Sequence, residues 1–172
     1  ISILFILKIN SSNAEIINEF KINGNQRLSN ETIIMFSKLE LGKDVSSNDL
    51  NRSIKFLYKT NYFKNIEMNL NNNILIINVE ENPIIQTIKI EGIKNKSILE
   101  SLNKITKKNE KYPYLLNEIN DQKNLLINSI RNSGFYFADV STKVVKNNNN
   151  SVDIIFIFDL GERAVVKKIN FL

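Results

Sequence analysis

A short apolar pattern that occurs twice is the feature that most constrains what this chain can fold into. Residues 17–24 read INEFKING and residues 85–92 read IQTIKIEG, with apolar side chains at the same three positions. Residues 166–171 carry the same three apolar positions again. Because self-similarity along a sequence marks repeated structural units, the chain should contain two modules and the start of a third.

Each copy of this pattern predicts a strand that ends in a tight turn. The last two apolar positions alternate with polar residues, which is typical of a strand with one buried face. Gly24 and Gly92 follow these strands, and glycine adopts a positive φ at no steric cost. We therefore expect a positive φ at both glycines.

The residues after each glycine predict a short helix and then a longer one. Ser29 and Ser46 stand where N-caps are expected, and Gly42 should end the short helix. The apolar positions at helical spacing are Ile33, Ile34, Phe36 and Leu39, then Leu50, Ile54, Leu57 and Tyr58. The second copy has Ile98, Leu99, Leu102 and Ile105, then Ile119, Leu126, Ile127 and Ile130, before the helix terminator Gly134.

Two β-hairpins complete the copies. Residues 63–70 and 74–80 are apolar-rich and are separated by asparagines, whose side chains tolerate left-handed backbone. Residues 136–145 and 152–159 flank a second asparagine-rich turn, and the returning strand should direct Phe156 and Phe158 to one face. Each copy thus predicts an α+β module of order β-α-α-β-β, in which two helices cover one face of a three-stranded sheet.

These modules predict the domain organisation. The first domain should span residues 15–82 and the second residues 83–162, and a third should start at residues 163–172. Pro83 has a fixed φ and forces the residue before it into extended backbone. The sequence therefore predicts an inter-domain hinge of limited swing formed by Glu81, Asn82 and Pro83.

The N-terminal residues resemble the remnant of a secretion signal. The apolar run at residues 1–7 is far shorter than the ~20 residues that a membrane-spanning helix needs. Ser12 and Ala14 are small residues at the two positions that a signal peptidase reads. We expect a signal-peptide remnant over residues 1–14 and a mature start at Glu15; the alternative is an ordinary N-terminal strand or helix.

The composition makes enzymatic and nucleic-acid functions unlikely. The chain has no Cys, His or Trp, which removes thiol nucleophiles and the usual thiolate and imidazole metal ligands. Its formal net charge is +5, but the basic residues are scattered among acidic ones instead of clustered. Neither a G-x-x-G phosphate clamp nor aromatic side chains for base stacking can be assigned. We expect no catalytic residue, no cofactor, no metal and no nucleic acid.

Several ordered motifs resemble one known family. The first copy contains GNQRL at residues 24–28, YFKNI at 62–66 and VEENP at 79–83, and the second contains GFYFADV at 134–140 and LGE at 160–162. Over residues 16–172 the chain resembles the POTRA modules of the outer-membrane barrel-assembly protein family.

The resemblance implies a location and partners for this chain. We expect it at the periplasmic face of the bacterial outer membrane, where it would bind unfolded outer-membrane protein precursors and accessory assembly lipoproteins. Periplasmic chaperones are further candidate partners. Contact with the membrane would be made through a C-terminal barrel that this chain does not contain.

The resemblance also implies a strand order of 1-3-2, which leaves the first hairpin strand of each module at a sheet edge. An edge strand has unpaired N–H and C=O groups that can pair with an incoming strand, a mode of binding called β-augmentation. The candidate polypeptide-binding residues are Lys64, Asn65, Ile66, Glu67, Met68 and Asn69 in the first module and Asp139, Val140, Ser141, Thr142, Lys143 and Val144 in the second. Alternatively, Lys64, Glu67 and Lys143 are charges that protect these edges from aggregation.

Other proteins also contain POTRA modules and provide alternative interpretations of this sequence. A two-partner secretion transporter or a translocation and assembly protein would carry similar modules. A cell-division protein typically has one POTRA module behind a membrane helix, which fits this sequence less well.

Overall fold

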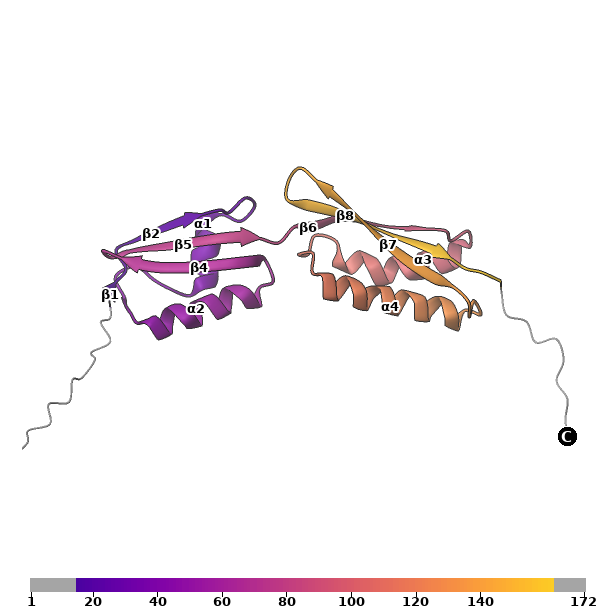
Figure 1. Ribbon diagram of the computed structural model, residues 1–172, viewed down its shortest axis with the longest axis horizontal. Helices are drawn as coiled ribbons and strands as arrows, with labels where there is room; N and C mark the ends of the chain where they lie inside the picture. Colours follow the sequence, from indigo (N-terminus) through magenta and orange to yellow (C-terminus); the bar gives the residue numbers. More distant parts are fainter. Residues whose placement is uncertain (1–14, 163–172) are drawn as a thin grey trace, which may run out of the picture. The chain divides into compact units, whose positions relative to one another are not determined.

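The computed structural model describes residues 15–162, and its internal contacts divide the chain between Glu81 and Asn82 into two units (Figure 1). The expected signal-peptide remnant at residues 1–14 and the expected start of a third module at residues 163–172 lie outside the described residues. Each unit has a three-stranded sheet that packs against helices, which confirms the predicted α+β class.

The first unit contains the predicted β-α-α-β-β series. Its sheet has the order β2-β5-β4, in which β2 is parallel and β4 antiparallel to the central strand β5. A separate two-stranded pair, β1 with β3, was not predicted, because two-residue strands show no alternation in the sequence. The elements are β1 (Glu15–Ile16), β2 (Glu19–Asn23), α1 (Asn30–Ser37), β3 (Asp44–Val45), α2 (Ser47–Lys59), β4 (Phe63–Asn71) and β5 (Ile74–Glu81).

Local capping explains where the helices of this unit begin and end. Helix α2 starts with a capping box, in which the Ser46 hydroxyl accepts from the Asp49 N–H and the Asp49 carboxylate accepts from the Ser46 N–H. Helix α1 ends at Lys38 in the left-handed conformation, φ 58°, so the predicted termination at Gly42 was wrong. The Ser37 hydroxyl donates to the Ile34 carbonyl and accepts from the Leu39 N–H, which stabilises this earlier turn.

The second unit repeats the topology with sheet order β6-β8-β7, again parallel on one side of the central strand and antiparallel on the other. Both sheets therefore have the expected order 1-3-2. The elements are β6 (Ile84–Glu91), α3 (Lys96–Thr106), the 3-10 helix η1 (Lys107–Asn109), α4 (Leu116–Asn132), β7 (Asp139–Asn147) and β8 (Ser151–Asp159).

The start of β7 differs from the prediction. The strand begins at Asp139 and not at Tyr136, because a turn closed by the Ala138 N–H and the Phe135 carbonyl precedes it. Within this turn the Ala138 side chain is buried in the core, while Tyr136 and Phe137 are 65% and 78% exposed.

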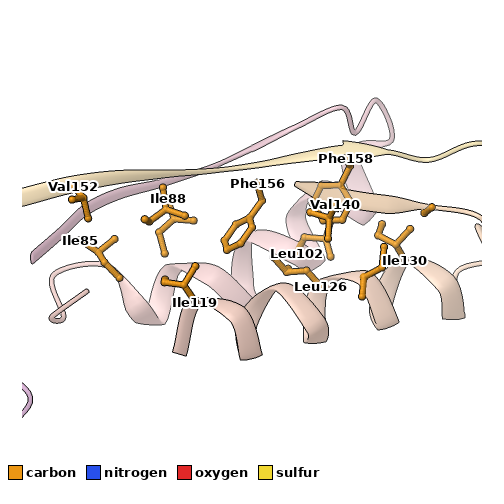
Figure 2. Close-up of a cluster of buried hydrophobic side chains, with 13 residues drawn as sticks. Ile85, Ile88, Leu102, Ile119, Leu126, Ile130, Val140, Val152, Phe156 and Phe158 are labelled. Carbon is orange, nitrogen blue, oxygen red and sulfur yellow. The ribbon is translucent and has the colours of Figure 1, made fainter. Parts of the chain in front are cut away.

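The core of the second unit lies between its sheet and its helices. Figure 2 shows Phe156 and Phe158 directed from the central strand toward the helices, as predicted from the alternation in β8. They meet apolar side chains from both helices, including Leu102 and Leu126, which are fully buried. The first unit has an equivalent core formed by Ile17, Ile33, Val45, Leu57, Phe63, Ile66, Leu75, Ile77 and Val79.

The glycines that end the repeated pattern, Gly24 and Gly92, lie in turns and closely approach the central strand of their sheets. Gly24 and Gly92 have φ values of 84° and 87°, which confirms the predicted positive φ. A Cβ at Gly24 would lie 2.1 Å from the carbonyl oxygen of Val79, and a Cβ at Gly92 would lie 2.0 Å from that of Phe158. The two modules therefore share a backbone contact that only glycine permits, and Val79 and Phe158 are equivalent positions.

Candidate functional site at the sheet edges

Strands β4 and β7 lie at the edges of their sheets, and the twelve candidate binding residues lie on them. Each three-stranded sheet also has a second edge, formed by β2 in the first unit and β6 in the second. These parallel edge strands were not among the residues predicted to bind polypeptides, although any open three-stranded sheet must have two edges.

The glycine contact determines which backbone groups of β4 face outward. Because the Val79 carbonyl lies against Gly24, which directly follows β2, the polar backbone groups of Val79 point away from β4. Its antiparallel partner Ile66 is therefore in a non-hydrogen-bonded pair, with its own N–H and C=O directed out of the sheet. The same alternation directs the backbone groups of Met68 and Leu70 outward and turns those of Glu67 and Asn69 toward β5.

The same geometry applies to β7. The Phe158 carbonyl lies against Gly92, which directly follows β6, and Phe158 pairs with Val140. The N–H and C=O groups of Val140, Thr142 and Val144 are therefore directed outward. Among residues 15–162, these three N–H groups have no hydrogen-bond partner. This segment of β7 is an unpaired ladder edge.

The side chains of β7 divide between the two faces of the sheet. Val140 is buried against the helices, Thr142 is half-buried, and Val144 is 38% exposed on the same face. Ser141 and Lys143 are exposed on the opposite face. A strand added beside residues 140–144 of β7 would thus have one apolar and one polar side.

The edge of the first unit is partly occupied by side chains. The Tyr58 hydroxyl, at the end of α2, accepts a hydrogen bond from the outward N–H of Ile66 at 3.2 Å. Lys64 lies at a β-bulge and pairs with Glu80 at 2.6 Å, and both side chains are more than half exposed. The structure thus places a hydrogen-bond acceptor, the Tyr58 hydroxyl, over the start of β4. The sequence predicted Tyr58 only as part of the apolar face of the longer helix.

A hydrogen-bonded carboxylate joins the strands of the second sheet. Asp153 on β8 accepts from the Thr87 hydroxyl on β6 and from the Asn147 amide on β7. The Thr87 hydrogen bond and then the Asn147 hydrogen bond hold the pKa of Asp153 below its ordinary value. This group ties the far end of the β7 edge to the rest of the sheet.

Two of the residues expected at the hinge, Glu81 and Pro83, form hydrogen bonds within their own units. Glu81 is a buried residue at the end of β5, and its carboxylate accepts from the N–H groups of Gln26, Arg27 and Leu28 at 3.0–3.2 Å. In the second unit the Pro83 carbonyl accepts from the Tyr114 N–H at 2.7 Å. The hinge stays a prediction, and the role of Glu81 in fixing the loop after Gly24 was not foreseen.

Surface cavities and clusters of metal-ligating side chains give weaker support for a binding site than the sheet edges do. Three surface cavities have volumes of about 210 or 220 Å³, below the ~300–1,000 Å³ of typical small-molecule sites. Within residues 15–162 there is no group of three or more His, Cys, Asp or Glu side chains that could hold a metal ion. No helix in this part of the chain is long and apolar enough to cross a membrane.

The chain thus consists of tandem β-α-α-β-β repeat domains with open sheet edges. Comparison with known protein families identifies the family to which these domains belong. Residues 15–82 and 83–161 each match the POTRA family, described as the surface antigen variable number repeat. The chain therefore belongs to the POTRA family.

The similarity extends to particular proteins over nearly the whole chain. The chain is 28% identical over 153 residues to the outer membrane protein assembly factor BamA of Neorickettsia risticii (strain Illinois), covering 89% of this chain and 21% of that protein. It is 23% identical over 187 residues to BamA of Buchnera aphidicola subsp. Acyrthosiphon pisum (strain APS), covering 98% of this chain and 28% of that protein. The chain thus spans less than a third of the length of these relatives.

A solved structure shows the same fold. The N-terminal domain of Omp85 from the thermophilic cyanobacterium Thermosynechococcus elongatus superposes with a TM-score of 0.51 at 14% identity, covering 82% of this chain and 61% of that one. The two modules are thus POTRA domains with distant homology to BamA, and the Omp85 domain shares their fold.

Proposed function

We propose that this chain is the periplasmic polypeptide-binding and scaffolding region of an outer-membrane protein assembly factor. It would receive unfolded barrel precursors as strands added to its sheet edges, and it would catalyse no reaction. The observation that carries the proposal is the run of outward N–H groups at Val140, Thr142 and Val144 on β7, which have no hydrogen-bond partner within residues 15–162. The similarity to two proteins named outer membrane protein assembly factors supports the assignment to this machinery.

Backbone pairing explains how one edge could serve many clients. Hydrogen bonds between main chains depend on extended conformation and only weakly on sequence, whereas alternate side chains supply limited selectivity. Barrel precursors suit this mode, since their strands alternate apolar and polar residues. Such a strand would place its apolar residues beside Val144 and its polar residues beside Ser141 and Lys143.

The same edges and the helix faces would bind the other partners. Accessory assembly lipoproteins, and periplasmic chaperones that deliver clients, are proposed as partners. We place the chain at the periplasmic face of the bacterial outer membrane because of the relationship to BamA.

Proline substitution at the edge tests the proposal. Thr142→Pro removes one outward N–H donor and blocks further ladder growth, and proline costs least on an edge strand. We expect it to weaken binding of an extended barrel-strand peptide at least about tenfold, as measured by NMR titration of the full chain. Circular dichroism should show that the variant remains folded.

Lys143→Gln is the matched control, because its side chain is exposed and its backbone groups face β8. It should leave the affinity for the barrel-strand peptide within about twofold of the wild-type value. Unchanged affinity in folded Thr142→Pro together with loss in Lys143→Gln would show that recognition is electrostatic and lies outside the ladder.

A further inference from the structure

The two hairpin edges are not equivalent in their hydrogen bonding. We infer that Tyr58 occupies the first outward N–H of the regular part of β4 and so weakens strand addition at the edge of the first module, and that β7 of the second module is the edge that takes an extended, alternating apolar polypeptide first. This inference rests on the proposed function and specifies which of the two sites binds.

Tyr58 occupies the position that an incoming strand would need. Its hydroxyl accepts from the Ile66 N–H, the first outward donor of the regular part of β4 after the bulge at Lys64. A partner strand pairing there must supply a carbonyl in place of this hydroxyl. Because α2 packs against β4, the Tyr58 side chain lies at this edge, and 40% of the residue is exposed. Binding to the first module therefore includes the loss of an existing hydrogen bond.

The second module has a residue of different chemistry at the equivalent place. The Asn61 N–H donates to the Tyr58 carbonyl, and the Gly134 N–H donates in the same way to the Arg131 carbonyl, so Tyr58 and Arg131 occupy matching positions at the helix ends. An arginine side chain has donors only and cannot accept from a strand N–H. Arg131 instead donates to the Ala138 carbonyl at 3.5 Å, just before β7 begins. The outward N–H of Val140 stays available.

The surface of β7 indicates the chemistry of the partner. Val144 and Val145 are 38% and 36% exposed, so the distal half of this edge presents apolar surface on both faces. Lys143 and Lys146 are exposed along the same strand. The fitting partner is an extended segment with alternating apolar residues and no cluster of positive charge.

Removing one oxygen atom tests the role of Tyr58. Tyr58→Phe keeps the ring but deletes the acceptor, so the Ile66 N–H should become available. An amide-labelled full chain is titrated with a synthetic ten-residue peptide of alternating valine and threonine, and the shifts of β4 and β7 amides are followed separately. In the wild type the β7 amides should shift at a lower peptide concentration than the β4 amides. In Tyr58→Phe the apparent affinity at β4 should rise about three- to tenfold, the equivalent of one net hydrogen bond, and that at β7 should not change.

Tyr112→Phe is the matched control, since Tyr112 is 62% exposed and lies on neither edge strand. It should alter neither affinity. Equal affinities of β4 and β7 in the wild type, or an unchanged β4 in Tyr58→Phe, would overturn the inference while leaving strand addition intact. Shifts at neither edge in either protein would overturn the proposed function itself and the inference with it.

Discussion

At the scale of single residues, the repeat glycines show how one atom limits the fold. Replacing Gly92 with alanine would put a Cβ 2.0 Å from the Phe158 carbonyl oxygen at a φ of 87°. Left-handed backbone costs alanine about 1–2 kcal/mol, and the forced shift of the central strand adds about 1–3 kcal/mol. We expect Gly92→Ala to lower the free energy of unfolding by about 2–5 kcal/mol, measured by denaturant titration.

Gly42 provides the matched control for this prediction. It has a φ of 75°, but nothing lies within 4 Å of the position of its Cβ. Gly42→Ala should lower the free energy of unfolding by only about 1–2 kcal/mol, the cost of left-handed backbone for alanine. Equal losses in both variants would show that the contact with the central strand contributes nothing.

The sequence reveals a residue's backbone requirement more readily than its long-range contacts. The positive φ of Gly24 and Gly92 followed from their position after a strand, and the asparagine turn likewise gave left-handed backbone at Asn72 and Asn73. The hydrogen bond that the Tyr58 hydroxyl accepts from the Ile66 N–H, and those that the Glu81 carboxylate accepts from the loop after Gly24, could not be predicted in this way. Both depend on how helix and sheet pack in three dimensions, and no local pattern encodes that distance.

At the scale of elements, the buried face of α2 stabilises the first module. Leu57 is fully buried and Ile54 is half-buried against the same core. We expect Leu57→Ala to lower the stability of this module by about 2–5 kcal/mol, because it deletes buried methyl groups and leaves a cavity. Ile54→Ala should cost less. A loss below about 0.5 kcal/mol at both positions in denaturant titrations would contradict the helix-face assignment.

The capping box of α2 makes the stability of this element depend on pH. Hydrogen bonds from the Ser46 hydroxyl and then from the Ser46 N–H hold the pKa of Asp49 below its ordinary value. A carboxylate whose pKa is lowered on folding contributes stability above its unfolded pKa, and this stability is lost as the pH falls through the folded pKa. The first module should therefore weaken in acid below the ordinary aspartate range, and Asp49→Asn should reduce the slope of stability against pH there. An identical slope in wild type and variant would show that the cap does not contribute.

Elements with a strong period were predicted well, and irregular ones were not. The two long helices and both hairpins have apolar residues at the spacing of their secondary structure, so their type and faces followed directly. The two-residue strands β1 and β3 have no period to read. The turn before β7 was misread because Tyr136 and Phe137 have high strand propensity, whereas the local hydrogen bond to Phe135 decides the conformation.

At the scale of the whole molecule, strand addition and electrostatic attraction make different predictions about salt. The chain has a formal net charge of +5, yet its proposed contacts are hydrogen bonds between main chains. Hydrogen bonds of this kind are little affected by counterions, whereas attraction between exposed charges is screened within about 8 Å at physiological ionic strength. Raising the salt concentration from roughly 0.05 M to 0.5 M should therefore change the affinity for an uncharged barrel-strand peptide by less than about twofold.

An acidic peptide of equal length serves as the comparison, since non-specific attraction to a basic chain should fall steeply over the same range. Both affinities can be measured by fluorescence anisotropy with labelled peptides. If the uncharged peptide lost affinity as steeply as the acidic one, the net charge of the chain, and not the open edge of β7, would account for binding.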